Sequence, residues 1–178
     1  MNLLKEGTTM QKREIIQHPF PPLYDAESRI LILGSFPSVK SREQRFFYGH
    51  PQNRFWKVMA AVCNASVPQT IQEKKDFLHK NHIALWDSVG QCSIIGSSDS
   101  SIGDVIPNNI SGILENAPIC SIFCNGKKSL SVYQKYVEPK TGHTAAVLPS
   151  TSPANAVWTL NRLIASWSDT IRPCLFPQ

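Results

Sequence analysis

Three segments combine small, polar and aromatic residues at a spacing that suits a ligand pocket. Residues 34–38 read Gly-Ser-Phe-Pro-Ser, residues 48–56 read Tyr-Gly-His-Pro-Gln-Asn-Arg-Phe-Trp, and residues 148–155 read Leu-Pro-Ser-Thr-Ser-Pro-Ala-Asn. The first and the last follow short apolar runs, which are typical of strands buried on both faces of a sheet. Open α/β sheets bind ligands outside the carboxyl ends of their strands. The sequence therefore predicts that these segments line one pocket.

Gly34 and Ser35 directly follow the first apolar run, at residues 29–33. A glycine there lets the backbone approach a ligand closely, and amides that follow a strand can point at an anion or a water. A plain tight turn, with Ser35 or Ser38 bonded to its own backbone, is the alternative. Because a serine hydroxyl is not a carboxylate base, Ser35 stays a catalytic candidate with at most a weak role.

Asn53 is the stronger catalytic candidate. Its amide carries a donor and an acceptor, so it can orient a water toward an electrophilic carbon without being a strong base. Helix capping is the alternative role. Arg54 is placed to reach a phosphate. Asp87 and Asp99 are candidates for shaping the pocket or anchoring its loop, and a solvated Asx turn is the favoured role of Asp99.

The apolar pattern predicts alternating strands and helices. Strands are expected at residues 29–33, 83–86, 119–123 and 145–148, and helices at residues 54–63, 72–80, 110–116, 127–137 and 152–167. Ser152 is the expected N-cap of the last helix, with Pro153 at its first position. Residues 87–104, rich in Ser and Gly, are expected to form a long loop. This order implies right-handed crossovers and a three-layer α/β/α fold around a four-stranded parallel sheet.

Length and composition favour one domain over residues 1–178, with residues 1–25 as a peripheral N-terminal segment. A chain of 178 residues that is 42% hydrophobic is long enough for one sizeable core. The proline-rich residues 18–23 are expected to pack along the surface. The formal charge of +5 favours a polyanionic partner such as nucleic acid.

The five cysteines contain no Cys-x-x-Cys pair, which argues against zinc and against a disulfide framework. Reduced thiols indicate a cytoplasmic protein. Residues 1–13 lack the apolar core of a signal peptide, and no apolar stretch approaches the length of a membrane helix. We expect no metal, no cofactor and no membrane partner.

Together the three segments resemble motifs of the uracil-DNA glycosylase superfamily. Its members surround a flipped base with a first-strand Gly-x-x-Pro-Gly/Ser loop, a Pro-x-Asn-x-Phe-Trp stretch and a late Pro-Ser loop. The chain is most similar to the hypoxanthine-DNA (deoxyinosine) glycosylase branch. The resemblance implies a monofunctional base excision repair enzyme that acts on DNA containing deaminated bases. Some members carry an iron–sulfur cluster, but the cysteine spacing here predicts none. We expect a monomer.

The resemblance also assigns roles to single residues. Asn53 matches the residue held responsible for catalysis in that branch, Tyr48 the aromatic that stacks on the extruded base, and Asn125 the amide that reads the base edge. Phe46 and Phe47 compete with Tyr48 for stacking. These assignments predict a cavity sized for one nucleobase, on which residues 53, 125 and 48 converge.

Other residues are expected around the base and along the DNA backbone. Gly34 and Phe36 are expected to contribute to base binding. The residues expected to contact the DNA backbone are Pro149, Ser150, Thr151, Ser152, Lys127 and Lys128. Leu148 stands where several relatives have His, and the loop carries no bulky wedge. Slow uracil excision and weak extrusion of a well-paired base are the expected consequences.

Three alternatives remain open at this point. One is a mismatch-directed uracil or thymine glycosylase, which the stretch at residues 51–56 also resembles. Another is a catalytically inactive module that binds damaged DNA, suggested by Ser35 and by Leu148. A small-molecule hydrolase or nucleotide binder is a weaker alternative, because the chain has neither a P-loop nor a nucleophile elbow.

Overall fold

A four-stranded parallel sheet forms the centre of the computed structural model, which describes residues 12–177. Its strands, in spatial order, are β3 (Ile83–Asp87), β2 (Ile30–Gly34), β6 (Ser121–Asn125) and β7 (Ala146–Leu148). The register pairs Gly34 with Asp87 and Asn125 with Leu148. The carboxyl ends of all four strands therefore meet at one edge of the sheet, as the sequence predicts.

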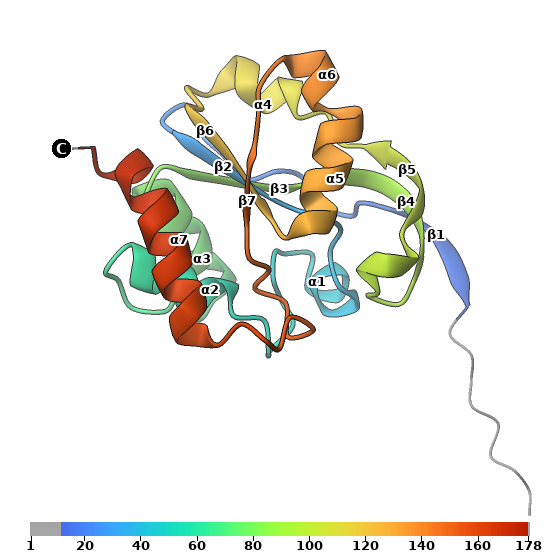
Figure 1. Cartoon of the computed structure of the whole chain (residues 1–178), viewed down its shortest axis with the longest axis horizontal. Helices are drawn as coiled ribbons and strands as arrows, with labels where there is room; N and C mark the ends of the chain where they lie inside the picture. Colours follow the sequence, from blue (N-terminus) through green and yellow to red (C-terminus); the bar gives the residue numbers. More distant parts are fainter. Residues whose placement is uncertain (1–11, 178) are drawn as a thin grey trace, which may run out of the picture.

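Helices cover both faces of this sheet, which confirms the predicted three-layer α/β/α arrangement (Figure 1). One face carries α2 (Phe55–Val62), α3 (Ile71–Lys80) and α7 (Leu160–Leu175), and the other carries α4 (Ser111–Asn116) and α5 (Lys127–Tyr136). The short helix α1 (Val39–Gln44) follows β2, and α6 (Glu138–Thr141) follows α5. The strand β2 is buried throughout, because its alternate residues enter the apolar clusters on opposite faces.

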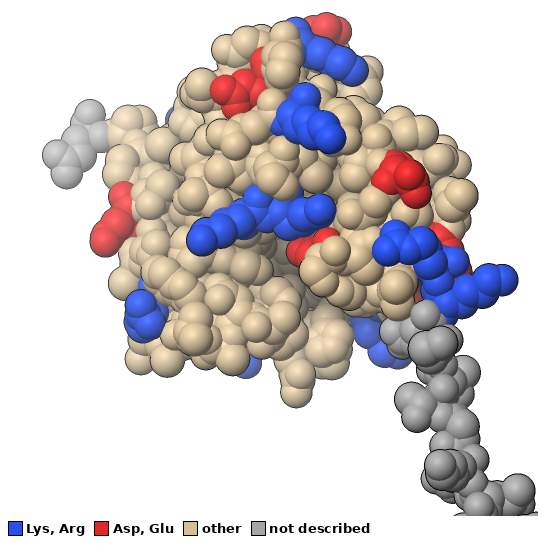
Figure 2. Space-filling view, turned by 45° about the vertical axis from the view of Figure 1, so that its right-hand side comes forward, with Lys and Arg blue, Asp and Glu red and all other residues tan. Residues whose placement is uncertain are grey.

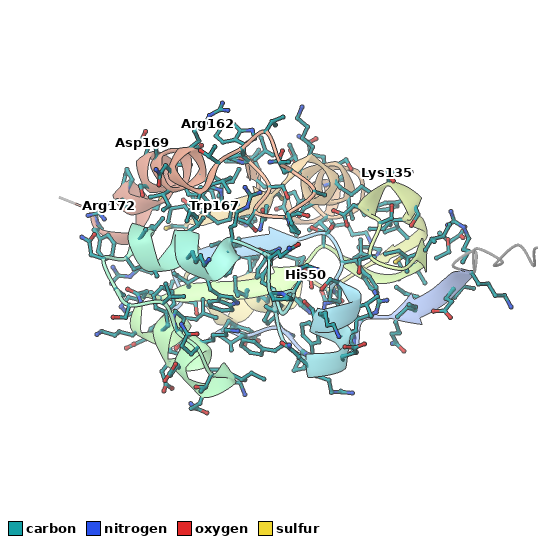
Figure 3. The ribbon with its side chains drawn as sticks, turned by 90° about the horizontal axis from the view of Figure 1, so that it is seen from below. His50, Lys135, Arg162, Trp167, Asp169 and Arg172 are labelled. Carbon is teal, nitrogen blue, oxygen red and sulfur yellow. The ribbon has the colours of Figure 1, made fainter. Side chains whose placement is uncertain are left out.

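The last helix begins later than expected. Ser152 and Pro153 do not start it; α7 begins at Leu160, and the Thr159 side chain accepts a hydrogen bond from the backbone N–H of Arg162. The reason is tertiary, because carbonyls between residues 151 and 158 accept hydrogen bonds from the Arg54 side chain, and the backbone there forms separate turns instead of a helix. Along α7, Trp167 lies on the side toward the other elements and is fully buried (Figure 3).

The prediction of a long loop at residues 87–104 is wrong. This stretch holds β4 (Val89–Ile95), the short 3₁₀ helix η1 (Asp99–Ser101) and the start of β5 (Gly103–Pro107). With β1 (Arg13–Gln17) they form an antiparallel sheet of order β1-β4-β5. The Ser and Gly content conceals these strands, since β4 is stabilised by pairing with β1, far away in the sequence.

The segment after β1 does not simply pack along the surface. The side chains of His18 and Phe20 are buried, and Leu23 forms a bridge with Leu85 of β3. Phe20 packs edge-on against Phe47, with 4.9 Å between ring centroids. Expectations for residues 1–11 lie outside the described residues. No helix among residues 12–177 combines the length and the apolar character needed to cross a membrane.

Candidate active site

A cavity of about 980 Å³ lies at the carboxyl edge of the parallel sheet. It is lined by residues from all three predicted segments and by Asp87, Asp99, Asn125 and Lys127. The volume is at the upper end of the range for small-molecule sites. The cavity is therefore larger than the single-nucleobase site expected from the sequence. In the face drawn in Figure 2, the surface is hollowed beside a row of Lys and Arg side chains.

Gly34 is required by the close approach of Asp87. A Cβ on Gly34 would lie 2.2 Å from Oδ1 of Asp87 and 3.3 Å from the Tyr48 hydroxyl. No side chain fits there without moving the carboxylate. Gly34 thus lets a buried carboxylate and a buried hydroxyl approach the same point of the cavity wall.

Asp87 is held by His18 from the segment after β1. Nε2 of His18 lies 2.7 Å from Oδ2 of Asp87, and Nδ1 lies 2.8 Å from the carbonyl oxygen of Phe20. The backbone N–H of Phe20 also lies 3.5 Å from Nδ1, so this ring nitrogen has both a donor and an acceptor beside it. The short Nε2–Oδ2 contact ties one oxygen of Asp87 to the ring of His18.

Thr151 joins the two amides of the site. Its hydroxyl donates to Oδ1 of Asn53 at 3.0 Å and accepts from Nδ2 of Asn125 at 2.9 Å. Its backbone N–H donates to Oδ1 of Asn125 at 3.0 Å. Because a hydroxyl has a single hydrogen, these contacts fix which end of each amide is oxygen and which is nitrogen. Asn53 and Asn125, 72 positions apart in the chain, thus converge on one fully buried threonine.

The oxygen of Asn53 already has two donors. Besides the Thr151 hydroxyl, it accepts the backbone N–H of Phe55 at 2.9 Å, a contact of the capping type at the start of α2. The expected capping role is therefore observed together with a place in the cavity wall. The Nδ2 group of Asn53 remains available to a ligand, and it offers donors and no acceptor.

Tyr48 also lines the cavity. Its ring stacks on Phe55, with centroids 3.9 Å apart and an interplanar angle of 16°. Its hydroxyl is buried, and although Asn125 lies nearby, the two do not form a hydrogen bond. Burial, and then the Asp87 carboxylate, raise the pKa of Tyr48 well above its ordinary value. Phe46 and Phe47 are core residues, although Phe47 also reaches the cavity wall.

Arg54 does not reach out toward a phosphate. Its guanidinium donates to the carbonyls of Ser152 at 2.7 Å and Asn155 at 3.1 Å, to that of Thr151 at 3.3 Å, and to that of Trp158. Arg54 therefore anchors the late loop instead of binding DNA. The buried Thr151 hydroxyl is used inside the protein, whereas Pro149, Ser150 and Ser152 line the cavity and stay partly accessible.

Ser35 and Asp99 form a pair at the cavity wall. The Ser35 hydroxyl donates to Oδ1 of Asp99 at 2.8 Å. Asp99 is an exposed residue, yet its carboxyl group lines the cavity and is surrounded by protein. Partial loss of water raises its pKa above the ordinary value. A solvated Asx turn is therefore the wrong description of Asp99.

The remaining expected residues lie near the same edge. Phe36 is buried in a small apolar cluster with Val89 of β4 and also lines the cavity. Lys127 is exposed at the start of α5 and lines the cavity, whereas Lys128 is partly buried beside it. His50 lies in the loop between α1 and α2 and does not belong to the cavity lining (Figure 3).

The roles of Thr151 and Asp99 in this site are not predicted by the sequence. It placed Thr151 among the DNA contacts, and nothing in a lone Ser-Thr-Ser run indicates a threonine that links two amides. Asp99 carried a signal, since it was noted as a polar candidate in the loop at residues 87–104. Within residues 12–177, no group of three or more His, Cys, Asp or Glu side chains is arranged to hold a metal ion.

A sequence model described as the Uracil DNA glycosylase superfamily matches residues 21–170. The chain belongs to this superfamily and is a DNA N-glycosylase, a hydrolase that cleaves N-glycosyl bonds. The resemblance inferred from the three segments is confirmed.

Similar proteins are found in two Methanosarcina species. A protein named hypoxanthine DNA glycosylase from Methanosarcina acetivorans is 37% identical over 83% of this chain and 94% of its own length. A protein of the same name from Methanosarcina barkeri is 33% identical over 76% of this chain and 86% of its own length. A solution NMR structure from M. acetivorans, provisionally described as a uracil DNA glycosylase, has a TM-score of 0.76 and 35% identity, covering 89% of this chain and 98% of the other.

Proposed function

We propose that this protein is a DNA-deoxyinosine glycosylase, which extrudes the deaminated purine hypoxanthine from DNA and hydrolyses its N-glycosidic bond. The observation that carries the proposal is the fixed orientation of the Asn125 amide by Thr151. The names of two similar proteins, hypoxanthine DNA glycosylase, support the same substrate. Extrusion is easiest for a mispaired base, which contributes to selectivity.

The fixed amide suits hypoxanthine and opposes adenine. With its oxygen toward the Thr151 N–H, Asn125 offers one remaining N–H and one remaining lone pair. Hypoxanthine presents the acceptor O6 and the donor N1–H, which match this pair. Adenine presents the reverse pattern, and a reversed Asn125 would direct its NH₂ group at the Thr151 N–H. Uracil presents the same pattern as hypoxanthine, so the amide alone does not exclude it.

In the proposed reaction, Tyr48 contacts the extruded base, and the free Nδ2 donors of Asn53 hold the oxygen of the attacking water. Departure of the base runs ahead of the attack by water, so positive charge develops on the sugar. Orientation of the water near C1′ then contributes by positioning. Lys127 and the loop at residues 149–152 lie at the cavity wall, where phosphates of the flanking strand would lie.

A panel of duplexes containing inosine, uracil, xanthine or a G·T mismatch tests this proposal. The expected result is release of hypoxanthine in preference to the other bases. Preferential uracil release with inosine untouched would assign the protein to the rival uracil or thymine activity. Binding to the damaged duplexes without release of any base would support the inactive module.

The Asn53→Ala variant tests the catalytic assignment within the same panel. Removing a positioned donor typically lowers the rate by about 10²–10³-fold, and we expect a loss of this size in single-turnover excision. Asn161→Ala on the exposed surface of α7 is the matched control, since Asn161 lies outside the cavity lining. Equal excision rates for the two variants would refute the role of Asn53.

A further inference from the structure

Glycosidic hydrolysis by water needs a group that accepts the proton of the water, and neither amide of the site can do so. Oδ1 of Asn53 is occupied by two donors, and Oδ1 of Asn125 by the Thr151 N–H and, in the proposed complex, by the N1–H of the base. Among the described residues that line the cavity, the carboxylates are Asp87 and Asp99. This inference rests on the proposed function and concerns which of these two is the base.

Asp87 is poorly suited to take a proton. One of its oxygens, Oδ2, is held at 2.7 Å by Nε2 of His18. A carboxylate that is tied to an imidazole by a short hydrogen bond is a weaker base than a free one. Asp87 is also buried, at 5% exposure, in the floor next to Gly34. It is better placed to shape the base pocket than to meet a water.

Asp99 has the properties that Asp87 lacks. It makes no ion pair with any residue in the described part of the chain, and the only hydrogen bond to its carboxylate there comes from the neutral hydroxyl of Ser35, at 2.8 Å to Oδ1. Its second oxygen, Oδ2, has no partner among residues 12–177. The residue is exposed and lines the cavity, so water reaches it.

The charges around Asp99 come from several elements. Partial loss of water around the carboxyl group raises its pKa most, and Asp87 of β3 raises it further, whereas the Ser35 hydrogen bond and Lys128 of α5 lower it. Cys92 of β4 and Tyr48 are the other titratable groups that interact with it. A carboxylate with a raised pKa is a more effective general base at neutral pH than an ordinary aspartate.

We propose that Asp99 is the general base of this glycosylase and that Ser35 holds Oδ1, leaving Oδ2 for the attacking water. The water oxygen forms a bond to C1′ while one of its protons passes to Oδ2. The C1′–N bond breaks, and its electron pair leaves with the base, which takes a proton from solvent. Asp99 then returns its proton to solvent, so one water is consumed and no oxidant, reductant or metal is needed.

The Asp99→Asn variant is the first test, because it keeps the acceptor for Ser35 and removes the base. Single-turnover release of hypoxanthine should fall by about 10²-fold, the usual contribution of a general base. The acidic limb of the pH–rate profile should disappear in the same variant. A D99N rate close to wild type, or an unchanged acidic limb, would overturn the assignment of Asp99.

Ser35→Ala provides a readout that a purely structural role does not predict. The Ser35 hydrogen bond stabilises the ionised carboxylate, so its loss raises the pKa of Asp99 further. Because the base must be ionised, the acidic limb should move to higher pH in this variant. A lower rate at every pH with an unmoved limb would contradict the proposed role of Ser35.

Asp104→Asn is the matched control. Asp104 of β5 also accepts a hydrogen bond from a serine hydroxyl, that of Ser93 at 2.7 Å, but it is exposed and does not line the cavity. We expect wild-type rates and an unmoved limb.

The experiments distinguish failure of the proposed function from failure of the role of Asp99. If wild type releases no base from any duplex, the proposed function fails; if wild type releases hypoxanthine and D99N does so equally well, only the role of Asp99 fails.

Discussion

At the scale of single residues, Thr151 determines what the two site amides offer to a ligand. It is fully buried and contributes three hydrogen bonds to Asn53 and Asn125, two through its hydroxyl and one through its N–H. The hydroxyl, together with the N–H of Phe55, leaves Asn53 with donors only. The hydroxyl and the N–H of Thr151 together leave Asn125 with one donor and one acceptor. Thr151, although fully buried, thereby determines which donors and acceptors the pocket presents to a ligand.

Replacement of Thr151 by valine should impair both stability and base release. The valine keeps the N–H but removes the hydroxyl, so both amides lose a buried partner, at a cost of about 1–3 kcal/mol in the free energy of unfolding. Thr151→Ser keeps the hydroxyl and should retain most of the stability and rate. Urea unfolding and single-turnover excision measure the two effects. Equal behaviour of the valine and serine variants would show that the hydroxyl is dispensable.

At the scale of elements, the antiparallel sheet β1-β4-β5 carries Asp99 to the cavity. The 3₁₀ helix η1 connects β4 to β5, and Arg13 of β1 fastens it by donating to the carbonyl of Ser101 at 2.8 Å and to the Ser93 hydroxyl at 2.9 Å. The Ser101 hydroxyl accepts from the Ile95 N–H at 2.8 Å. The position of Asp99 thus depends on a strand near the start of the chain.

Replacing Arg13 by alanine should loosen η1. Loss of these contacts weakens the attachment by about 1 kcal/mol, the net value of a typical hydrogen bond. Hydrogen–deuterium exchange of residues 96–103 should become faster, and base release should slow moderately. Lys12→Ala is the control, because it removes the same charge from an exposed neighbouring residue. The same exchange rates in both variants would show that Arg13 does not hold η1.

At the scale of the whole molecule, the formal charge of +5 and the site geometry point to the same polyanionic partner. Arg54 directs most of its donors to carbonyls of the late loop. Lys127, exposed at the cavity wall where α5 begins, is available for phosphates. Its position at the start of a helix, where a cation is unfavourable against the helix dipole, is consistent with a phosphate partner.

Lys127→Ala should make DNA binding less dependent on salt. Each lost phosphate contact reduces the slope of log affinity against log salt concentration by about 0.9, because fewer counterions are released. Fluorescence anisotropy over a series of salt concentrations measures this slope. Lys80→Ala serves as the control, since Lys80 ends α3 just before β3 begins, at the opposite edge of the sheet. Identical slopes for the two variants would exclude Lys127 as a phosphate contact.

The sequence by itself determined the parallel sheet, most of the helices around it and the segments that form the cavity. The apolar runs at β2, β3, β6 and β7 and the helical spacing in α2 are local patterns, and chain order then brings the strand ends to one edge. Residues at the carboxyl ends of those strands, such as Asn125, are therefore predicted at the edge of the sheet where the cavity lies.

Only the tertiary structure decided how those residues are used. The hydrogen bond from Ser35 to Asp99 joins positions 64 apart, and that from Thr151 to Asn53 joins positions 98 apart. The start of α7 and the pairing of β1 with β4 also depend on partners that are distant in the chain. No local pattern records such contacts, because hydrogen-bond direction and burial are properties of the packed molecule and not of neighbouring residues along the sequence.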